Sequence, residues 1–332
     1  MTKYSFSNNI IDNLDIISKK NKMKNSFNKI NKKPLLFNSI FFKNLSFKYY
    51  ENSFLFNSGS SSIIKHPKFG DRYILNIRCN NYYLKKNGSS SIKSNQKTIT
   101  SNCICIINNN LDVIYKNIFR PNLRDNIPYV GIEDIRIFSF KDKMYYIGSA
   151  YDNNTNKIKI SSFELKLHEN YKINFIEPNF STSFNWEKNW VFFENNNEMF
   201  VIYKWNPIYI CKIDYNTNKL DLIKSIPTNN DFTNLRGSTN GVFFDDKIWF
   251  IVHCQIDIYG VKNYFHRFVT FNNDLSIYGY SNMFKFEGYL IEFCIGMEIS
   301  YRNNFLITYS TLDSTTKLIV VSYDTIKNLL IN

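Results

Sequence analysis

Five hairpin patterns recur along this chain at intervals of about 50 to 70 residues. In each pattern a run of apolar residues is followed by a short polar turn and then by an aromatic-rich run that ends in a polar or charged residue. A repeat of this length is typical of propeller blades and other β repeats. Five repeats therefore predict an all-β protein, a five-bladed β-propeller. The five turns lie at residues 70–72, 141–143, 195–198, 245–247 and 302–304.

Segments between the hairpins alternate apolar and polar residues and predict the remaining strands of four-stranded sheets. Helical periodicity is confined to residues 10–20 and 324–331. Because the spacing is regular and no long linker interrupts it, one closed repeat domain is favoured over the alternative, an array of β-sandwiches. A chain of 332 residues with 44% hydrophobic residues can fill the core of such a domain. The further strands are predicted at residues 103–108, 157–165, 208–214, 266–271 and 317–323.

The net charge of +13 would ordinarily suggest nucleic acid as a partner. Lys, Asn, Ile, Phe and Tyr are all abundant, which is the set that an AT-rich coding sequence favours, so the charge is a weak signal and no nucleic-acid partner is expected. We predict a partly disordered Lys/Asn-rich leader at residues 1–35, with Asp12 and Asp15 as its acids, and a single propeller domain at 36–332. Electrostatic contact of the leader with an acidic partner is the alternative. Its lysines are Lys3, Lys19, Lys20, Lys22, Lys24, Lys29, Lys32 and Lys33.

The sequence contains no run of 18 or more apolar residues, and its first residues lack the apolar stretch of a secretory signal. We therefore expect a cytoplasmic protein that is not inserted in a membrane. Neither the cysteines nor the four histidines show metal-ligand spacing, and His253 with His266 is the one pair to consider. No metal or cofactor is expected, and the cysteines are predicted to be buried, reduced thiols. They are Cys79, Cys103, Cys105, Cys211, Cys254 and Cys294.

The segment Gly131-Ile132-Glu133-Asp134-Ile135-Arg136 places two acids and an arginine at the start of a predicted strand. Adjacent residues of a strand point to opposite faces, so we expect Glu133 and Asp134 to diverge. Asp134 and Arg136 should share a face, where the cation can hold the carboxylate and a bound polar ligand. This arrangement suits an active site, and the alternative is a salt-bridged strand entrance.

In a propeller the inner strands converge on a central channel, so residues at strand ends can meet although they lie far apart in the sequence. Two acids combined with several cations and amides would suit a neutral polyol that is flanked by an anion. The alternative is that each residue is a separate, solvent-exposed strand end. The set is Arg78, Asp134, Arg136, Lys188, Asn189, Arg236, His253 and Asp313.

Over roughly residues 55–325 the chain resembles the mannoside phosphorylases of glycoside hydrolase family 130 and the related propeller β-mannosyltransferases. The family motif is Glu-Asp-Pro-Arg after a Gly-x pair, and residues 131–136 match it except that Ile135 replaces the proline. The other matching segments follow in the family's order. They are Asn76-Ile77-Arg78-Cys79-Asn80, Glu187-Lys188-Asn189-Trp190, Leu235-Arg236-Gly237-Ser238-Thr239, His253 and Thr311-Leu312-Asp313-Ser314.

The resemblance implies an inverting enzyme that transfers a mannosyl group between a β-mannoside and a phosphate-bearing partner. It implies that Asp134 is the proton donor and acts through a sugar hydroxyl. Because phosphate is itself the nucleophile, cations would replace the second carboxylate of an inverting hydrolase. The implied substrate-binding residues are Arg78, Arg136 and Asp313, and the implied phosphate-binding residues are Lys188, Asn189, Arg236 and His253.

More than one reaction is compatible with these residues. Lys188 presents a point charge and Arg236 a fork, which leaves open whether the anion is inorganic phosphate, a sugar phosphate or a nucleotide sugar. The alternatives to phosphorolysis are a nucleotide-sugar-dependent β-mannosyltransferase, a glycoside hydrolase and a non-catalytic glycan-binding propeller. Specificity for the carbohydrate is expected to rest on the loops between the blades.

Overall fold

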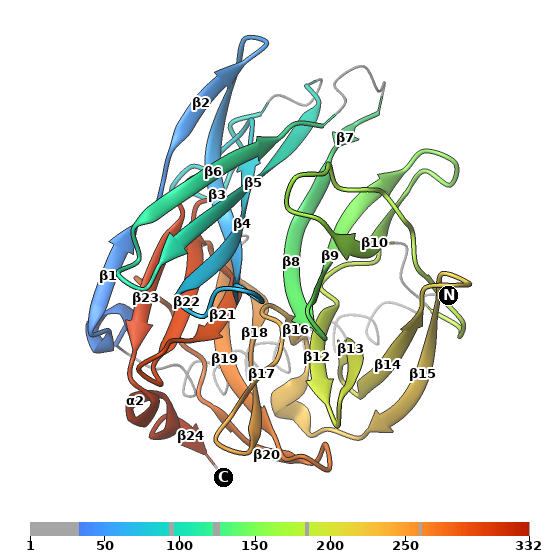
Figure 1. Cartoon of the computed structure of the whole chain (residues 1–332), viewed down its shortest axis with the longest axis vertical. Helices are drawn as coiled ribbons and strands as arrows, with labels where there is room; N and C mark the ends of the chain where they lie inside the picture. The colour runs from blue at the N-terminus through green and yellow to red at the C-terminus, as the bar shows by residue number, and fades with distance from the viewer. Residues whose placement is uncertain (1–32, 93–95, 122–126, 183–185, 259–260, 332) are drawn as a thin grey trace, which may run out of the picture.

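The computed structural model describes residues 33–92, 96–121, 127–182, 186–258 and 261–331. Five β-sheets stand in a ring around a common axis, which confirms the predicted five-bladed propeller (Figure 1). We number the blades 1 to 5 in chain order. The helix predicted at residues 10–20 and nearly all of the predicted leader lie outside the described residues. Leu35, the last residue of that leader, is buried with an exposed fraction of 2%.

The first three blades follow one another along the chain. Blade 1 contains β2 (Lys48–Glu51), β3 (Phe54–Lys65), β4 (Arg72–Asn80), β5 (Thr98–Asn108) and β6 (Val113–Phe119), with β7 (Tyr129–Val130) beside β5. Blade 2 contains β8 (Ile132–Phe140), β9 (Lys143–Asp152) and β10 (Lys157–Leu165). Blade 3 contains β12 (Val191–Asn195), β13 (Glu198–Trp205), β14 (Ile208–Asp214) and β15 (Lys219–Ile226), with β11 (Glu177–Pro178) beside β15.

The last two blades take in both ends of the described chain. Blade 4 contains β16 (Arg236–Gly237), β17 (Val242–Phe244), β18 (Lys247–Ile258), β19 (Val261–Phe271), β20 (Ile277–Ser281) and β24 (Leu330–Ile331). Blade 5 contains β21 (Glu292–Ile299), β22 (Phe305–Thr311), β23 (Lys317–Val321) and β1 (Phe41–Asn44). The described helices are short: η1 (Leu35–Asn38), η2 (Asn230–Phe232) and α2 (Tyr323–Lys327). The helix predicted at residues 324–331 is thus one turn of helix followed by β24.

Each of the five predicted turns joins two consecutive strands of one blade, as expected. Three of these turns consist of two residues that both have positive φ, which gives the turn the twist that matches the flanking strands. Asn and Asp tolerate this left-handed backbone better than most residues, and they dominate these turns. The three pairs are Lys141 and Asp142 (φ 47° and 60°), Asn196 and Asn197 (50° and 59°), and Asp245 and Asp246 (51° and 55°).

The predicted four strands per blade hold for blade 5, whereas the described strands of the other blades number from three to six. In blade 2, isolated bridges from β10 to Phe175 and Trp186 occupy the place of a fourth strand. Ring closure is made by β1, which pairs antiparallel with β23 and completes blade 5. The first strand of the domain therefore lies in the sheet of blade 5, while the last strand, β24, pairs with β20 in blade 4.

Successive side chains of an inner strand point to opposite faces of its sheet, so they pack against the two neighbouring blades in turn. Phe192 of β12 stacks on Phe138 of blade 2 with ring centroids 5.5 Å apart. The next residue, Phe193, packs edge-on against Phe250 of blade 4 at 5.8 Å. Complete burial of a side chain of this size contributes about 1.5–3 kcal/mol, so one strand stabilises two blade interfaces.

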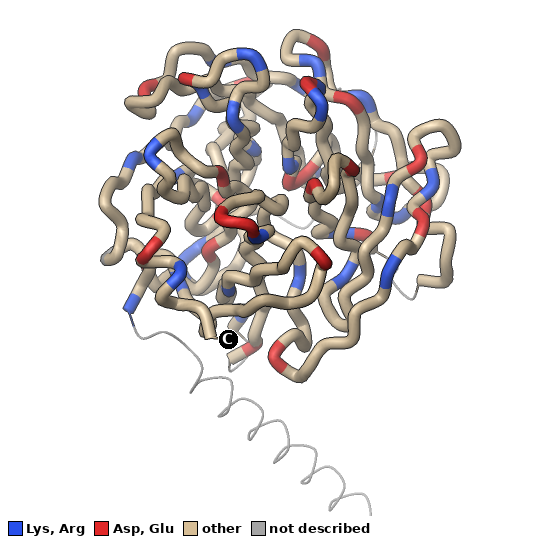
Figure 2. The backbone as a smooth tube through the Cα atoms, turned by 60° about the horizontal axis from the view of Figure 1, so that its bottom comes forward, with Lys and Arg blue, Asp and Glu red and all other residues tan. Residues whose placement is uncertain are grey.

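The six cysteines lie buried as free thiols, as the sequence predicts. In the part of the chain that the structure describes, no helix combines the length and the apolar character needed to cross a membrane. Figure 2 shows Lys and Arg positions interspersed with Asp and Glu positions around the ring.

Candidate functional site

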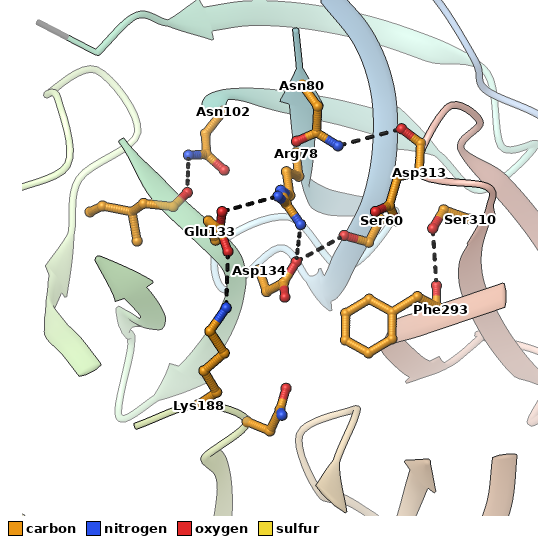
Figure 3. A network of polar contacts seen from close by, with 12 residues as sticks. Ser60, Arg78, Asn80, Asn102, Glu133, Asp134, Lys188, Phe293, Ser310 and Asp313 are labelled. Carbon is orange, nitrogen blue, oxygen red and sulfur yellow. Dashed lines mark hydrogen bonds and ion pairs between the residues drawn. The ribbon is translucent and has the colours of Figure 1, made fainter. Parts of the chain in front are cut away.

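The predicted site residues come from all five blades and from the turns beside them. Arg78 lies near the end of β4, Asp134 and Arg136 in β8, Lys188 and Asn189 just before β12, Arg236 in β16, His253 in β18, and Asp313 between β22 and β23. In a close-up, Arg78, Glu133, Asp134, Lys188 and Asp313 gather in one network of polar contacts (Figure 3). The strand ends therefore converge as the propeller geometry requires.

A β-bulge shapes the start of β8. The pairing of β8 with β9 shifts register between Glu133 and Arg136, and Asp134 has a left-handed backbone with φ of 51°. The bulge interrupts the alternation of side chains, so both acids reach Arg78 (Figure 3). Arg78 Nη1 lies 2.9 Å from Asp134 Oδ1, and Arg78 Nη2 lies 3.3 Å from Glu133 Oε1. The prediction that Glu133 and Asp134 diverge is wrong.

Arg136 makes a different contact from the predicted one. Its side chain is 1% exposed, and Nη1 donates to the backbone carbonyl of Asp134 at 2.9 Å. The Nε and Nη2 groups donate to the carbonyls of Ser238 at 2.5 Å and Gly237 at 3.2 Å, and Nη2 also donates to Asn189 Oδ1 at 3.4 Å. Burial lowers the pKa of Arg136 to about 10, so the guanidinium is still charged at neutral pH. Arg136 thus ties the backbone of the β8 bulge to the segment around β16.

The carboxylate of Asp134 lies in a positive environment. Burial alone would raise its pKa, but the charges of Arg78, Arg136 and Lys188, together with the hydrogen bond from Arg78, outweigh burial and lower the pKa below the ordinary value. Ser60 Oγ adds a contact of 3.4 Å to Asp134 Oδ1. Asp134 is therefore ionised at neutral pH, the form that can accept a proton.

Asp313 reaches the same network from the turn between β22 and β23. Leu312 and Asp313 both have left-handed backbones there, with φ of 54° and 50°. Asn80 Nδ2 donates to the carbonyl of Asp313 at 3.4 Å. Tyr82 Oη accepts from Arg78 Nη2 at 3.0 Å and donates to Asp313 Oδ2 at 3.5 Å. Burial raises the pKa of Asp313, in contrast to that of Asp134.

The predicted anion-binding residues come from blades 3 and 4. Lys188 Nζ is 3.4 Å from Glu133 Oε2, so its charge is shared with a carboxylate. Asn189 has a left-handed backbone with φ of 66°. Arg236 is exposed, and the pairing of β16 with β18 sets it directly opposite His253. These residues offer two cations and one amide, and Lys188 is in direct contact with the carboxyl network.

His253 is buried and neutral. Burial lowers its pKa well below the ordinary value, and the nearby charges of His266 and of two arginines lower it further. Its Nδ1 lies 2.8 Å from Ser238 Oγ, and its ring stacks on Tyr264 with centroids 5.9 Å apart. His266 is its cross-strand partner, with ring centroids 6.5 Å apart. Among the described residues, no group of three or more His, Cys, Asp or Glu side chains is placed to hold a metal.

Several residues of this network are absent from the predicted set. The motif contains Glu133 but does not indicate its partner, and neither Tyr82 nor Ser60 belongs to the predicted set. One signal for Ser60 was available: Ser58-Gly59-Ser60-Ser61-Ser62 is a run of small polar residues inside an otherwise apolar strand. Tyr82 lies two residues beyond β4, and its contact with Asp313 depends on a segment more than 200 residues away, so local sequence gives no signal for it.

Comparisons with known proteins place the fold. No protein-family model and no curated protein sequence matches the chain. Among solved structures, MPT-4, a mannose phosphorylase from Leishmania mexicana in complex with phosphate ion, matches with a TM-score of 0.56 and 10% sequence identity, covering 95% of this chain and 98% of that chain. MPT-1, a GDP-Man-dependent mannosyltransferase from Leishmania mexicana, matches with a TM-score of 0.51 and 11% identity, covering 81% of this chain and 86% of that chain.

A third match is the RS223 β-xylosidase, with a TM-score of 0.50 and 10% identity, covering 80% of this chain and 93% of that chain. At these identities the likeness establishes the fold. It also bears out the structural side of the resemblance seen in the sequence, since two of the neighbours are a mannose phosphorylase and a mannosyltransferase.

Proposed function

We propose that this protein is a carbohydrate-active enzyme that transfers a mannosyl group, with inversion, between a β-mannoside and phosphate. The observation that carries the proposal is the network around Arg78. It brings the carboxyl groups of Glu133 and Asp134 into contact with Arg78, links Asp313 to them through Tyr82, and sets the separate cation Lys188 beside Glu133. The neighbours in fold that act on mannose support the choice of sugar.

Inversion at an anomeric carbon needs a proton donor on the leaving-group side and a nucleophile on the opposite face. Phosphate is a nucleophile without help from a base, so cations can take the place of the second carboxylate. Lys188 and Arg236 would position the anion, and Asn189 and neutral His253 would add hydrogen bonds to its oxygens. Asp134 would exchange the proton, through a sugar hydroxyl, in either direction of the reaction.

The remaining residues would hold the sugar and the geometry. Arg78 and Asp313 lie in the network with Asp134 and would bind sugar hydroxyl groups. Arg136 was expected to bind substrate, but its donors contact protein carbonyls and Asn189. We propose that it positions Asp134 relative to Asn189 and to the β16 segment that carries Arg236. No cofactor takes part in this scheme.

A nucleotide sugar is the second candidate for the donor. Arg236 is exposed, so an anion bound there can extend outward as a diphosphate linked to a nucleoside. An arginine fork suits such a group. The reaction then differs in its leaving group and keeps Asp134 in its role.

The test is incubation of the whole chain with mannose 1-phosphate or a panel of nucleotide sugars, together with simple sugar acceptors. Release of phosphate from mannose 1-phosphate would support the phosphorylase, and release of a nucleoside diphosphate the transferase. Lys188→Ala or Arg236→Ala should raise the KM for the phosphate-bearing substrate, whereas Lys212→Ala, which removes an exposed lysine paired with Glu198, should not. Phosphate-independent release of free sugar from a β-mannoside would contradict both and indicate a hydrolase.

A further inference from the structure

Three carboxyl groups share the positive charge around Arg78. Glu133 contacts Arg78 at 3.3 Å and Lys188 at 3.4 Å, and Asp134 contacts Arg78 at 2.9 Å. Asp313 is different: its carboxyl group accepts from the hydroxyl of Tyr82 at 3.5 Å. Within the described residues no cation lies at ion-pair distance from Asp313. The cations therefore form ion pairs with the first two acids, whereas Asp313 feels the charge of Arg78 without a direct ion pair.

The groups that face Asp313 come from three other elements. Arg78 is on β4, and Tyr82 follows that strand. Glu133 and Asp134 are on β8. Tyr264 is on β19, and the charge of Asp313 contributes to raising its pKa. Arg78 is the one cation of this set, and both acids of β8 already engage it. Asp313 is half-buried, and a carboxyl held beside two carboxylates and a weak hydroxyl donor favours its neutral form.

The pKa directions agree with this geometry. Burial raises the pKa of Asp313 most; Arg78 opposes the rise, and the charges of Asp134 and Glu133 add to it. The pKa of Asp134 is displaced in the opposite direction. Two carboxyl groups of one site whose environments separate them in this way usually take different acid–base roles.

We propose that Asp313 carries a proton in the resting site and is the source of the proton that Asp134, being ionised, lacks. This inference rests on the proposed mannosyl transfer. In phosphorolysis a phosphate oxygen bonds to the anomeric carbon, and the glycosidic C–O bond breaks with its electron pair on the leaving oxygen. The proton of Asp313 passes through substrate hydroxyls and Asp134 to that oxygen. The monoester proton of the new sugar phosphate then restores Asp313.

The first experiment needs no substrate. The whole chain is labelled with ¹³C at aspartate carboxyls, and isotope-edited infrared spectra are recorded as a function of pH. A protonated aspartate band should persist well above pH 3.9, near which an ordinary Asp titrates. It should vanish in Asp313→Asn. In Asp134→Asn its midpoint should move to lower pH, because one of the carboxylate charges that raise the pKa of Asp313 is removed. Labelling aspartate keeps the buried Glu187, Glu292 and Glu298, whose pKa values burial also raises, out of the spectrum.

Tyr82→Phe is a second variant, in case Asp313→Asn fails to fold. The hydroxyl of Tyr82 favours the ionised form of Asp313, so its removal should move the midpoint of the band to higher pH. Asp112→Asn, at an exposed position, should leave the midpoint unchanged. Persistence of the band in Asp313→Asn, or an unshifted midpoint in Tyr82→Phe, would overturn the assignment of the proton to Asp313.

The pH profile of turnover separates this inference from the proposed function. On a substrate that the wild type phosphorolyses, the alkaline limb of kcat/KM reports the loss of the essential acid. That limb should disappear in Asp313→Asn, leaving a lower and flatter profile. If the limb persists in Asp313→Asn, Asp313 is not the proton source, although mannosyl transfer would stand. If the infrared band behaves as expected but no donor is turned over, the protonation of Asp313 stands and the proposed function fails.

Discussion

The backbone conformation of single residues positions the polar side chains of this site. Asp134, Asn189 and Asp313 all have positive φ, at 51°, 66° and 50°. Asp and Asn tolerate the left-handed region better than most residues, whereas Leu312, with φ of 54°, bears a larger strain. Strained residues of this kind persist where the surrounding structure holds them, and they cluster at functional sites. Here Asp134 lies at the β8 bulge, Asp313 in the turn before β23 and Asn189 just before β12, and each belongs to the polar network around β8 or borders it.

The first prediction concerns Asp134→Asn. The amide keeps the shape of the carboxyl but cannot exchange a proton, so kcat should fall by roughly 10²–10⁴-fold, the usual contribution of general acid–base catalysis. Sugar binding should be largely retained. The measurement is steady-state kinetics on a substrate that the wild type turns over, with Asp112→Asn as the exposed control. Equal activity of wild type and Asp134→Asn would remove Asp134 from the mechanism.

The second prediction concerns the pH dependence of stability in Asp313→Asn. The folded pKa of Asp313 is raised, so its neutral form stabilises the fold fully below pH of about 3.9, and that contribution is lost as pH rises through the folded pKa. An amide is neutral at every pH. Asp313→Asn should therefore melt at a higher temperature than the wild type at neutral pH, and the difference should shrink as pH falls toward 4.

Thermal melts from pH 4 to 8 test this expectation. Asp134→Asn provides the opposite case, because the folded pKa of Asp134 is lowered. Its ionised form stabilises the fold above the ordinary range of Asp, and Asp134→Asn should melt below the wild type at neutral pH. A Tm for Asp313→Asn that drops below that of the wild type as pH rises would contradict the raised pKa.

At the scale of elements, the sequence predicted the hairpins because their signals are local. Pairs such as Asn196-Asn197 and Asp245-Asp246 determine the turn, and the flanking alternation determines the strands. The bulge in β8 was not predictable in this way. Ser62 of β3 donates to the carbonyl of Ile135 at 2.8 Å, and Asn240 donates to the carbonyl of Ile137 at 2.7 Å. These contacts come from blade 1 and from the segment between β16 and β17, so the path of β8 depends on neighbours that local sequence does not reveal.

The third prediction tests how β16 positions the anion-binding loop. A Cβ added at Gly237 would lie 2.3 Å from the carbonyl oxygen of Asn189 and 2.8 Å from Val191, so this loop must move in Gly237→Ala. Overpacking of this kind costs about 1–3 kcal/mol, and the displaced Asn189 should raise the KM for the phosphate-bearing substrate. At Gly70 an added Cβ meets nothing within 4 Å, so Gly70→Ala is the matched control.

Chemical denaturation and steady-state kinetics give the two readouts for Gly237→Ala. Both should change in Gly237→Ala and neither in Gly70→Ala. If only stability changes, the contact between Gly237 and Asn189 supports the fold without positioning the anion.

At the scale of the whole molecule, the number of blades was predictable because it follows from a period, whereas the way the ring closes was not. Closure pairs Phe41 of β1 with Val320 of β23, and Leu45 N donates to the carbonyl of Thr316 at 2.9 Å. Such pairings join segments that lie far apart in the chain, and no repeat in the sequence marks β1 as the partner of β23. The site depends on this closure, since Asp313 lies in the turn that leads into β23.

The fourth prediction is that β1 is required for a stable ring. A shortened protein that starts at Phe47 loses β1, leaves β23 as an unpaired sheet edge and removes the backbone bonds that Ile40 and Leu45 make to blade 5. It should unfold at a lower temperature than a protein that starts at Lys33, and it should expose the apolar cluster that Leu45 shares with Leu318 and Val320. Thermal melts and binding of a hydrophobic dye measure the two effects. Because Asp313 sits beside the opened edge, the aspartate that retains its proton in the longer protein should titrate closer to the ordinary range in the shorter one. Equal melting temperatures of the two proteins would show that the ring closes without β1.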